Sequence, residues 1–164
     1  MTRARFLGGM REVAAADWNA LAGRDYPFLR HEFLCALEDS GSVGGDSGWE
    51  PHHLLLHEGS RIVGALPCYL KQHSYGEYVF DWAWADAYQR HGLAYYPKLL
   101  SAVPFSPIQG PRLLASDPAN RQRLLRAALA LAGETSSLHV LFPPETEAAQ
   151  MAGAGMLIRH GVQF

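Results

Sequence analysis

The sequence predicts an α/β domain, because helical patterns and short apolar runs alternate along its 164 residues. The clearest helix signal is Asp117-Pro118, since Asp is a strong N-cap and Pro suits the first helical position. The clearest strand signals are the apolar runs 52–57 and 137–142. At this length, and with 48% hydrophobic residues, the chain is predicted to form one domain, residues 1–164, with a sizeable core.

Composition and charge disfavour several classes of protein. The formal net charge of -2 argues against broad, non-specific nucleic-acid binding. The two cysteines, Cys35 and Cys68, lie in apolar runs and form no disulfide framework or metal quartet, so we expect buried thiols in a reducing compartment. No apolar run is long enough for a membrane span, and no signal-peptide pattern is recognisable at Met1. These observations together predict a cytoplasmic protein.

The first part of the chain is predicted to form a strand and then two helices. Residues 6–13 are a short strand candidate. Asp17 is predicted to cap a short helix that Gly23 closes. Pro27 is predicted to open a second helix that ends by Ser40. The apolar face of this second helix contains Leu29, Phe33, Leu34 and Leu37.

A hairpin is predicted next, with strands over residues 52–57 and 61–72 joined by a glycine-containing turn. Pro67 in the second strand predicts an edge position or a bulge, because proline cannot donate a ladder hydrogen bond. His53 and His57 do not predict a zinc site, because four residues of strand span about 13 Å. No metal is therefore expected here.

Short elements are predicted to follow one another in the second part of the chain. A short helix is predicted over 95–102, an extended or turning segment over 104–111, and a long helix up to residue 132. A further helix is predicted to begin at Pro143-Pro144 and stop at the glycines around residue 154. Residues 156–164 are predicted to form a last strand, which is still running where the sequence stops.

The most distinctive stretch runs from Ser74 to Arg112 and is far richer in aromatic residues than the chain average of 11%. Residues 78–86 alternate with period two, which predicts a strand. One face of this strand would hold Tyr78, Phe80, Trp82, Trp84 and Asp86. Rigid aromatic side chains that end in a carboxylate suit a pocket wall. The alternative is a core strand whose aspartate caps the following turn.

Five stretches together resemble the FemAB-like bacterial proteins, which are described as peptidoglycan biosynthesis or recognition proteins of the GNAT acyltransferase superfamily. These stretches are residues 27–33, 64–71, 74–86, 95–99 and 104–112. The resemblance extends from about Tyr26 to Phe164. Proteins of this family are longer and have two GNAT-like halves, so the chain resembles an N-terminal half that is cut before its second half.

The resemblance implies a GNAT-like twisted mixed sheet flanked by helices, and acyl or aminoacyl transfer to an amine of a peptide-like or peptidoglycan-precursor substrate. Such a reaction needs a proton acceptor for the amine and donors for the developing oxyanion, but no metal. The candidate catalytic residues are Asp86, its substitute Asp81, and Tyr88. The candidate substrate-binding residues are Tyr75, Trp82, Trp84, His91, Tyr96, Lys98 and Arg112. Among these, Tyr88, His91 and Tyr96 are expected on a proton path or at the substrate, while Lys98 and Arg112 could pair with an acidic group.

The acyl donor stays open between aminoacyl-tRNA and acyl-CoA. The only match to a CoA phosphate loop is Gln150–Gly155, and it lies at the end of a predicted helix, where backbone amides are not free. Three hypotheses follow: an acyl- or aminoacyltransferase, a non-catalytic recognition half, and an acetyl-CoA-dependent N-acetyltransferase. The expected partners are a peptide-like substrate, the second half of a longer protein, and tRNA only as a donor. A second copy is also expected, paired through the last strand or through the surface beside the aromatic stretch.

Overall fold

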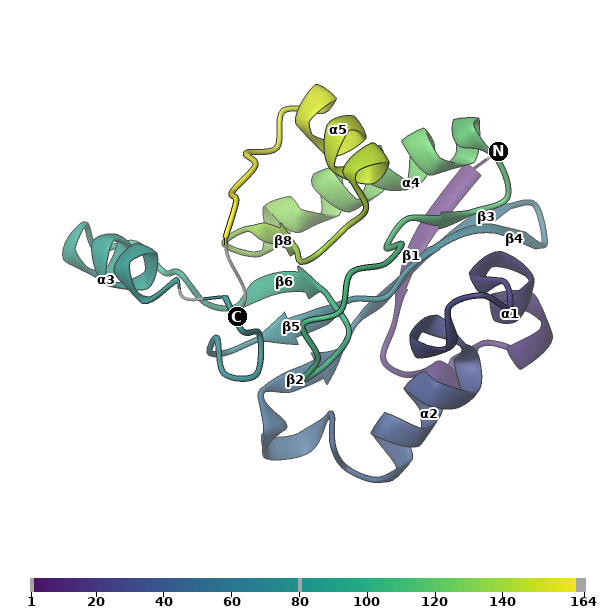
Figure 1. The fold of residues 1–164 in the computed structure, drawn as a ribbon, viewed down its shortest axis with the longest axis horizontal. Coiled ribbons are helices and arrows are strands. Elements are labelled where there is room, and N and C mark those ends of the chain that lie inside the picture. The colour runs from purple at the N-terminus through teal and green to yellow at the C-terminus, as the bar shows by residue number, and fades with distance from the viewer. Residues whose placement is uncertain (1, 80, 162–164) are drawn as a thin grey trace.

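The computed structural model describes residues 2–79 and 81–161, which form two four-stranded sheets and five α-helices. Figure 1 shows α4 and α5 on one side of the sheets and α1 and α2 on the other, with α3 standing apart. The helices are α1 (Ala15–Ala22), α2 (His31–Asp39), α3 (Trp82–Arg90), α4 (Pro118–Leu131) and α5 (Glu145–Gly153). Short 3-10 turns lie at Met10–Glu12, Pro27–Leu29, Gly45–Ser47 and Ala132–Glu134. The predicted α/β class is confirmed.

The first sheet is antiparallel and has the order β1-β3-β4-β7. Its strands are β1 (Thr2–Leu7), β3 (His53–Glu58), β4 (Arg61–Leu66) and β7 (Leu114–Ala115). The second sheet is mixed, because β6 pairs antiparallel with β5 and parallel with β8 in the order β2-β5-β6-β8. Its strands are β2 (Trp49–Pro51), β5 (Tyr69–Lys71), β6 (Lys98–Ser101) and β8 (Leu138–Val140). Helices therefore flank a mixed sheet arrangement, as predicted.

The two sheets meet where the predicted hairpin breaks at Pro67 and Cys68. The backbone N–H of His52 donates to the carbonyl of Cys68 at 2.9 Å. The N–H of Cys68 donates to Nδ1 of the buried His53 side chain at 3.1 Å, so a side chain replaces a strand carbonyl. Pro67 sits at this interruption, where its missing N–H costs no ladder hydrogen bond. The predicted strand over 61–72 is thus two strands, one in each sheet.

The apolar core has a layer on each side of the first sheet. Leu54, Leu56 and Val63 pack with Leu124 of α4 and Met151 of α5. On the opposite side, the core contains Leu7, Trp18, Leu34, Leu55 and Ala65. The indole N–H of Trp18 donates to the Leu29 carbonyl at 2.7 Å, which satisfies its buried polar atom. A third cluster beneath the second sheet includes Trp49, Tyr69 and Leu100.

Helix boundaries agree with the sequence where a local cap determines them. Asp117 caps α4 through a 2.8 Å hydrogen bond from the Asn120 N–H to its carboxylate, as predicted. Gly23 ends α1 with a positive φ of 72°, also as predicted. The prediction for Asp17 was wrong, because α1 begins at Ala15 and Asp17 lies in its first turn. Pro27 opens only a 3-10 turn, and the strand predicted over 6–13 ends at Leu7.

The strand predicted over 78–86 was wrong, because the described residues of this stretch from Trp82 onward form α3. The carbonyl of Asp81 accepts from the N–H groups of Trp84 and Ala85, which begins the helix. Alternating alanines are compatible with the period of a strand and with that of a helix. Alanine is the strongest helix former, and no strand of the described chain pairs with this segment, so the helix forms. On a helix, Trp82 and Asp86 stay on one face, whereas Trp84 turns away from them. Phe80, which the prediction also placed on this face, lies outside the described residues.

Two further predicted elements are corrected. Residues 95–102 do not form a helix, since β6 runs through Lys98–Ser101 between β5 and β8 and bonds to both. Hydrogen bonds from two neighbouring strands outweigh the weak local helical pattern of this segment. Residues 156–161 form no strand, and 162–164 lie outside the described part. The expected pairing with a second copy therefore has no strand to carry it within 156–161.

Candidate functional site

An arm of the chain, residues 72–97, leaves the second sheet after β5 and returns at β6. Figure 1 shows its helix α3 projecting away from the rest of the molecule. None of the residues of α3 is buried. Five of the eight exposed large hydrophobic side chains in the described residues belong to this arm, namely Tyr75, Tyr78, Trp82, Trp84 and Leu93. Such a concentration of exposed apolar surface is typical of a binding surface.

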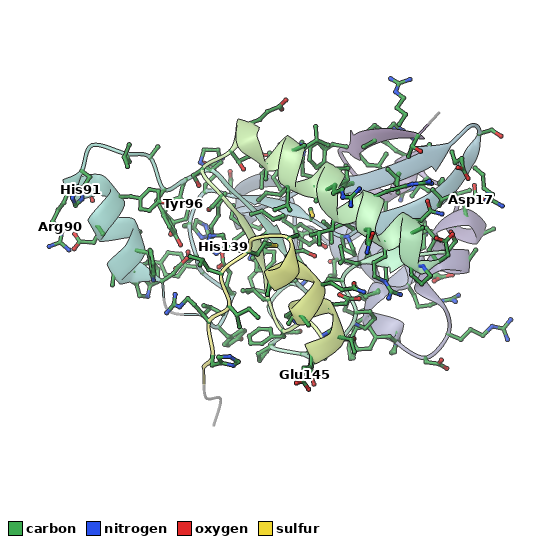
Figure 2. All side chains as sticks on the ribbon, turned by 90° about the horizontal axis from the view of Figure 1, so that it is seen from above. Asp17, Arg90, His91, Tyr96, His139 and Glu145 are labelled. Carbon is green, nitrogen blue, oxygen red and sulfur yellow. The ribbon has the colours of Figure 1, made fainter. Side chains whose placement is uncertain are left out.

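An open cavity of about 470 Å³ lies between one face of α3 and the returning segment 93–96. The helix contributes positions with the spacing i, i+3, i+4 and i+7, so its cavity side is a single face. The residues that line the cavity are Trp82, Ala85, Asp86, Gln89, Leu93, Tyr95 and Tyr96. Figure 2 shows Tyr96 at the base of the arm, with Arg90 and His91 at the outer end of α3. The cavity thus has aromatic walls and one carboxylate.

A buried ionic cluster lies at the base of the arm, centred on Lys98 of β6. The Lys98 ammonium donates to Oδ2 of Asp81 at 2.6 Å, to Oε2 of Glu77 at 2.8 Å and to Oγ of Ser74 at 2.8 Å. All four side chains are buried, with Lys98 completely inaccessible. Lys98 uses all three of its donors, so the buried cation is fully satisfied.

Two tyrosines connect this cluster to the cavity. The Tyr95 hydroxyl donates to Oδ2 of Asp81 at 2.7 Å. The Tyr96 hydroxyl lies 2.8 Å from the hydroxyl of Ser74, which in turn accepts from Lys98. Because both rings line the cavity, a hydrogen-bonded chain runs from its wall to the buried lysine.

The two carboxylates of the cluster have different environments. Burial disfavours the charged form of Asp81, but hydrogen bonds from Lys98, Tyr95 and Ser74 outweigh it and hold the pKa of Asp81 below its ordinary value. Burial raises the pKa of Glu77, and the bond from Lys98 offsets this only in part. One oxygen of each carboxylate, Oδ1 of Asp81 and Oε1 of Glu77, has no hydrogen-bond partner in the described structure. In acid–base sites, two neighbouring ionisable groups commonly have pKa values that their environments shift in opposite directions, as for Asp81 and Glu77 here.

A second buried lysine belongs to the same cluster. Lys71 of β5 lies directly across the sheet from Lys98 in the strand register. Its ammonium donates to the Tyr75 carbonyl at 3.1 Å and sits 3.9 Å above the Trp49 ring. Burial lowers the pKa of Lys71 to about 8, although the charge of Glu77 acts in the opposite direction. Two cations and two carboxylates therefore share one buried volume.

His139 of β8 faces the cluster from the other side of β6. Its ring lies 6.0 Å from the ring of Tyr95 at a right angle, and its Nε2 is 2.9 Å from the Ser137 hydroxyl. Burial and the nearby charge of Lys98 lower the pKa of His139 to about 4. The imidazole is thus neutral at physiological pH and adds no charge to the cluster.

The structure brings four of the predicted residues to the cavity or its edge. Trp82, Asp86 and Tyr96 line it, and the ring of Tyr75 lies 5.4 Å from that of Trp82. Asp86 is exposed and forms a 2.7 Å ion pair with Arg90 one turn further along the helix. This exposure makes Asp86 accessible to a charged ligand group.

Three other predicted residues lie around this site without lining the cavity. The ring of Tyr88 packs 5.1 Å from that of Tyr95. His91 is exposed at the end of α3, where its Nδ1 lies 2.7 Å from the carbonyl of Ala87. Trp84 points away from the cavity face, and the guanidinium of Arg159 lies 5.8 Å from its ring.

Lys98 and Arg112 were predicted to bind an acidic substrate group, but both side chains are completely buried. Arg112 donates to the backbone carbonyls of four residues at 2.7 to 3.1 Å: Leu141, Gly110, Pro111 and Ile108. These contacts support a structural role for Arg112. Asp81, predicted as the substitute base, is a buried partner of Lys98 and does not line the cavity.

Sequence reasoning missed four members of the site, namely Lys71, Ser74, Glu77 and Tyr95. Ser74, Glu77 and Tyr95 lie in the aromatic stretch 74–112, and Lys71 ends the stretch 64–71 that contributes to the family resemblance. No spacing rule could pair them, because Glu77 and Lys98 are 21 residues apart and meet only across the base of the arm.

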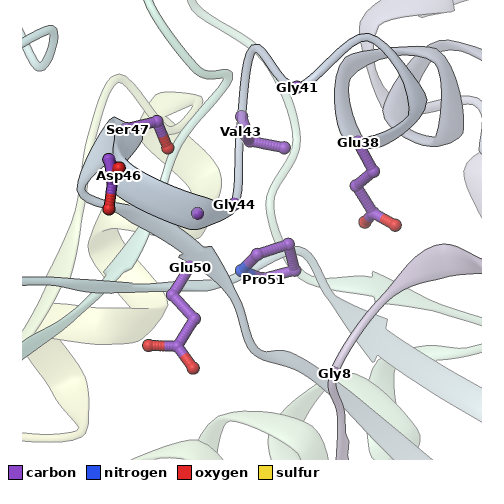
Figure 3. A pocket seen from close by; sticks show the side chains of 10 residues that line it. Gly8, Glu38, Gly41, Val43, Gly44, Asp46, Ser47, Glu50 and Pro51 are labelled. Carbon is purple, nitrogen blue, oxygen red and sulfur yellow. The ribbon is translucent and has the colours of Figure 1, made fainter.

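A second cavity, of about 640 Å³, lies beside the glycine-rich segment 41–48 (Figure 3). Its charged lining residues are Glu38, Asp46 and Glu50. The Glu38 carboxylate already accepts from the N–H of Met10 at 2.8 Å and contacts Nε2 of His53 at 3.1 Å. A cavity lined by carboxylates without a basic side chain is unsuited to bind phosphate. We therefore take the cavity beneath α3 as the candidate site.

Neither a metal centre nor a membrane span is found in the described part of the chain. No three His, Cys, Asp or Glu side chains within 2–79 and 81–161 are grouped so that they could hold a metal ion. Over the same residues, no helix combines the length and the apolar character that crossing a bilayer requires.

The fold and the site define a mixed α/β protein whose projecting aromatic arm encloses a cavity above a buried ionic cluster. The family model FemAB-like, described as peptidoglycan biosynthesis/recognition, matches residues 9–164. The chain therefore belongs to the FemAB-like family. No curated protein and no solved structure matches it.

Proposed function

We propose that this protein transfers an acyl or aminoacyl group to an amine of a peptide-like peptidoglycan precursor, and that the amine binds in the cavity beneath α3. The observation that carries the proposal is the hydrogen-bonded chain from the cavity wall to buried ionisable groups, through Tyr96 and Ser74 to Lys98. The family description, peptidoglycan biosynthesis/recognition, supports the substrate class. We also propose that the two sheets and their flanking helices are a GNAT-like fold.

An amine substrate is an ammonium ion at neutral pH and must lose a proton before it can attack an acyl group. The exposed Asp86 carboxylate and the ring faces of Trp82 and Tyr96 would hold the ammonium ion by charge and by cation–π attraction. The Tyr96 hydroxyl would then accept the released proton while it passes its own to Ser74. The Asp86 carboxylate has the negative charge that binding of the ammonium ion requires, and the Tyr96 oxygen has the lone pair that accepts its proton.

The acyl donor is proposed to be an aminoacyl-tRNA or an acyl thioester. The CoA-type match, residues 150–155, falls at the C-terminal end of α5 and just beyond it. Backbone amides there donate within the helix, for example Ala154 to the carbonyl of Gln150 at 3.1 Å, and cannot hold a pyrophosphate. This geometry favours a donor that is not held at that motif.

Recognition without catalysis is the second candidate function. The exposed aromatic side chains of the arm favour it, because they would bind a ligand whether or not a reaction follows. In that case the cavity would bind a lysine-containing peptide, but no amide bond would form.

The test is to incubate the protein with alanyl-tRNA or acetyl-CoA and a lysine-containing peptide, and to detect the acylated peptide by mass spectrometry. We expect Tyr96→Phe to lower the rate about 100-fold, because it removes one proton-transfer group. Asp86→Asn should abolish transfer and leave the fold intact. Tyr78→Phe is the matched control, since Tyr78 is exposed and does not line the cavity. Full activity in both cavity variants would show that the cavity is not the site.

A further inference from the structure

We infer that Glu77 is the final acceptor of the proton that the amine releases in the cavity. The inference rests on the proposed transfer reaction and extends it to a residue that does not touch the substrate. Glu77 is bonded to Lys98 at 2.8 Å, and Lys98 is bonded to Ser74 at the same distance. Ser74 reaches the cavity through Tyr96. Every link of this path is a hydrogen bond between two side chains.

Asp81 is the other carboxylate on Lys98, but its contacts make it the weaker proton acceptor. Its Oδ2 accepts from both Lys98 and Tyr95, at 2.6 and 2.7 Å. Protonation of Asp81 would disrupt two charge-assisted hydrogen bonds, whereas Glu77 has only one, from Lys98. Asp81 therefore stays ionised and holds Lys98 in place, while Glu77 can change its charge.

The surroundings of Glu77 favour this exchange. The charged groups that face it are Lys98 from β6, Lys71 from β5 and the carboxylate of Asp81. Glu77 is 2% exposed, and its Oε1 has no hydrogen-bond partner in the described structure. Burial raises the pKa of Glu77 and brings it closer to neutrality, which suits a group that accepts a proton in one step and returns it in another. His139, neutral above a pKa of about 4, does not compete for the proton.

The proton balance of the path is complete. The ammonium ion gives one proton to the oxygen of Tyr96, whose own proton moves to Ser74. Lys98 first gives a proton to Oε2 of Glu77 and becomes a neutral amine. Its amino group then turns so that the new lone pair faces Ser74 and accepts the Ser74 proton, which makes Lys98 an ammonium ion again. The neutral amine then attacks the acyl carbon, its second proton goes to the leaving oxygen or sulfur, and one amide bond forms as one ester or thioester bond breaks. Glu77 returns its proton to solvent along the same path after the product leaves.

The first test needs no substrate. An infrared titration of the full chain should show a protonated carboxyl band that persists above pH 4.3 or so, the ordinary pKa of glutamate. The band should be absent in Glu77→Gln and retained in Glu145→Gln, because Glu145 is exposed and lies away from Tyr96 (Figure 2). A band that disappears near the ordinary value, or that is the same in Glu77→Gln, would overturn the inference.

The second test uses the transfer assay. Glu77→Gln should slow transfer at least about tenfold and remove the acid limb of its pH–rate profile, an effect that a purely structural residue would not have. Ser74→Ala should do the same, because it breaks the path while all four charges remain. Glu145→Gln should leave the profile unchanged. An unaltered acid limb in Glu77→Gln and Ser74→Ala overturns the role of Glu77 alone, whereas absence of transfer by the unchanged protein overturns the proposed function itself.

Discussion

Lys98 and Arg112 are both fully buried cations, but they are satisfied in opposite ways. Arg112 donates to four backbone carbonyls, which carry no titratable proton. Lys98 donates only to side chains, two of them carboxylates, and one of its partners is connected to a cavity. Burial lowers the pKa of Arg112, yet an arginine stays charged at any physiological pH.

This contrast separates a structural site from a candidate functional one. A guanidinium bonded to carbonyls stabilises one backbone arrangement, here the segment between β6 and β7 against Leu141, which directly follows β8. A lysine bonded to carboxylates can redistribute protons without any change of backbone. Burial of a charge by itself therefore says little about function, whereas the titration of its partners is informative.

The largest expected effects come from removing each cation. Arg112→Met should lower the free energy of unfolding by about 3–5 kcal/mol, because buried carbonyls lose their donors. Lys98→Met should cost a similar amount, since Glu77 and Asp81 stay buried but lose the ammonium group that donates to both. Urea denaturation at neutral pH measures both.

If Lys98 and Arg112 are satisfied in different ways, only the stability lost in Lys98→Met can be restored by further side-chain substitutions. Adding Glu77→Gln and Asp81→Asn to Lys98→Met should restore most of the stability, because no buried carboxylate is then left without Lys98. Lys71 keeps its contacts with the Tyr75 carbonyl and the Trp49 ring in this variant. No side-chain substitution can restore stability in this way for Arg112→Met. A triple variant no more stable than Lys98→Met alone would show that the two sites are held by the same kind of interaction.

A smaller effect is expected from pH. The pKa of Lys71 is about 8 in the folded chain and about 10.4 when unfolded, so between these values the unfolded chain binds more protons. The contribution of Lys71 to stability should therefore rise with pH in this window, by at most about 1.4 kcal/mol per pH unit, and should fall again as pH drops toward 8. Lys71→Met should lose this contribution.

The control for this measurement is Arg126→Met, because Arg126 is exposed on α4. Contributions from buried Cys68 and Tyr69, whose pKa values burial raises, are common to all variants and cancel in the difference. Equal slopes for the unchanged protein and Lys71→Met would mean that Lys71 does not titrate with the cluster.

The smallest effects on stability are expected at the two tryptophans of α3. Trp82→Ala and Trp84→Ala should each cost no more than about 1 kcal/mol, since both side chains are 48% exposed. Binding of a lysine-containing peptide, measured by calorimetry, should weaken about tenfold in Trp82→Ala and stay unchanged in Trp84→Ala. A stability loss of about 3–5 kcal/mol in either variant would instead identify a core residue.

Local sequence was sufficient where the determinant of structure is itself local. Asp117 and Pro118 determined the start of α4, and Gly153 and Gly155 the end of α5, because capping involves only neighbouring backbone groups. The aromatic stretch was also correctly recognised as exceptional, and Trp82, Asp86 and Tyr96 from it line the cavity. The family was recognised from the same stretches and confirmed.

Only the tertiary structure decided what these residues contact. Residues 82–90 would form a strand only if a partner strand lay beside them, and a period-two sequence pattern does not show whether one is present. Lys98 was predicted to pair with an acidic substrate group, but β6 lies in the middle of its sheet and buries the Lys98 side chain. Its meeting with Ser74, Glu77 and Asp81 arises because the arm leaves and re-enters the sheet on adjacent strands. Hydrogen bonds that close across such a distance are specified by chain topology, and no local residue pattern encodes them.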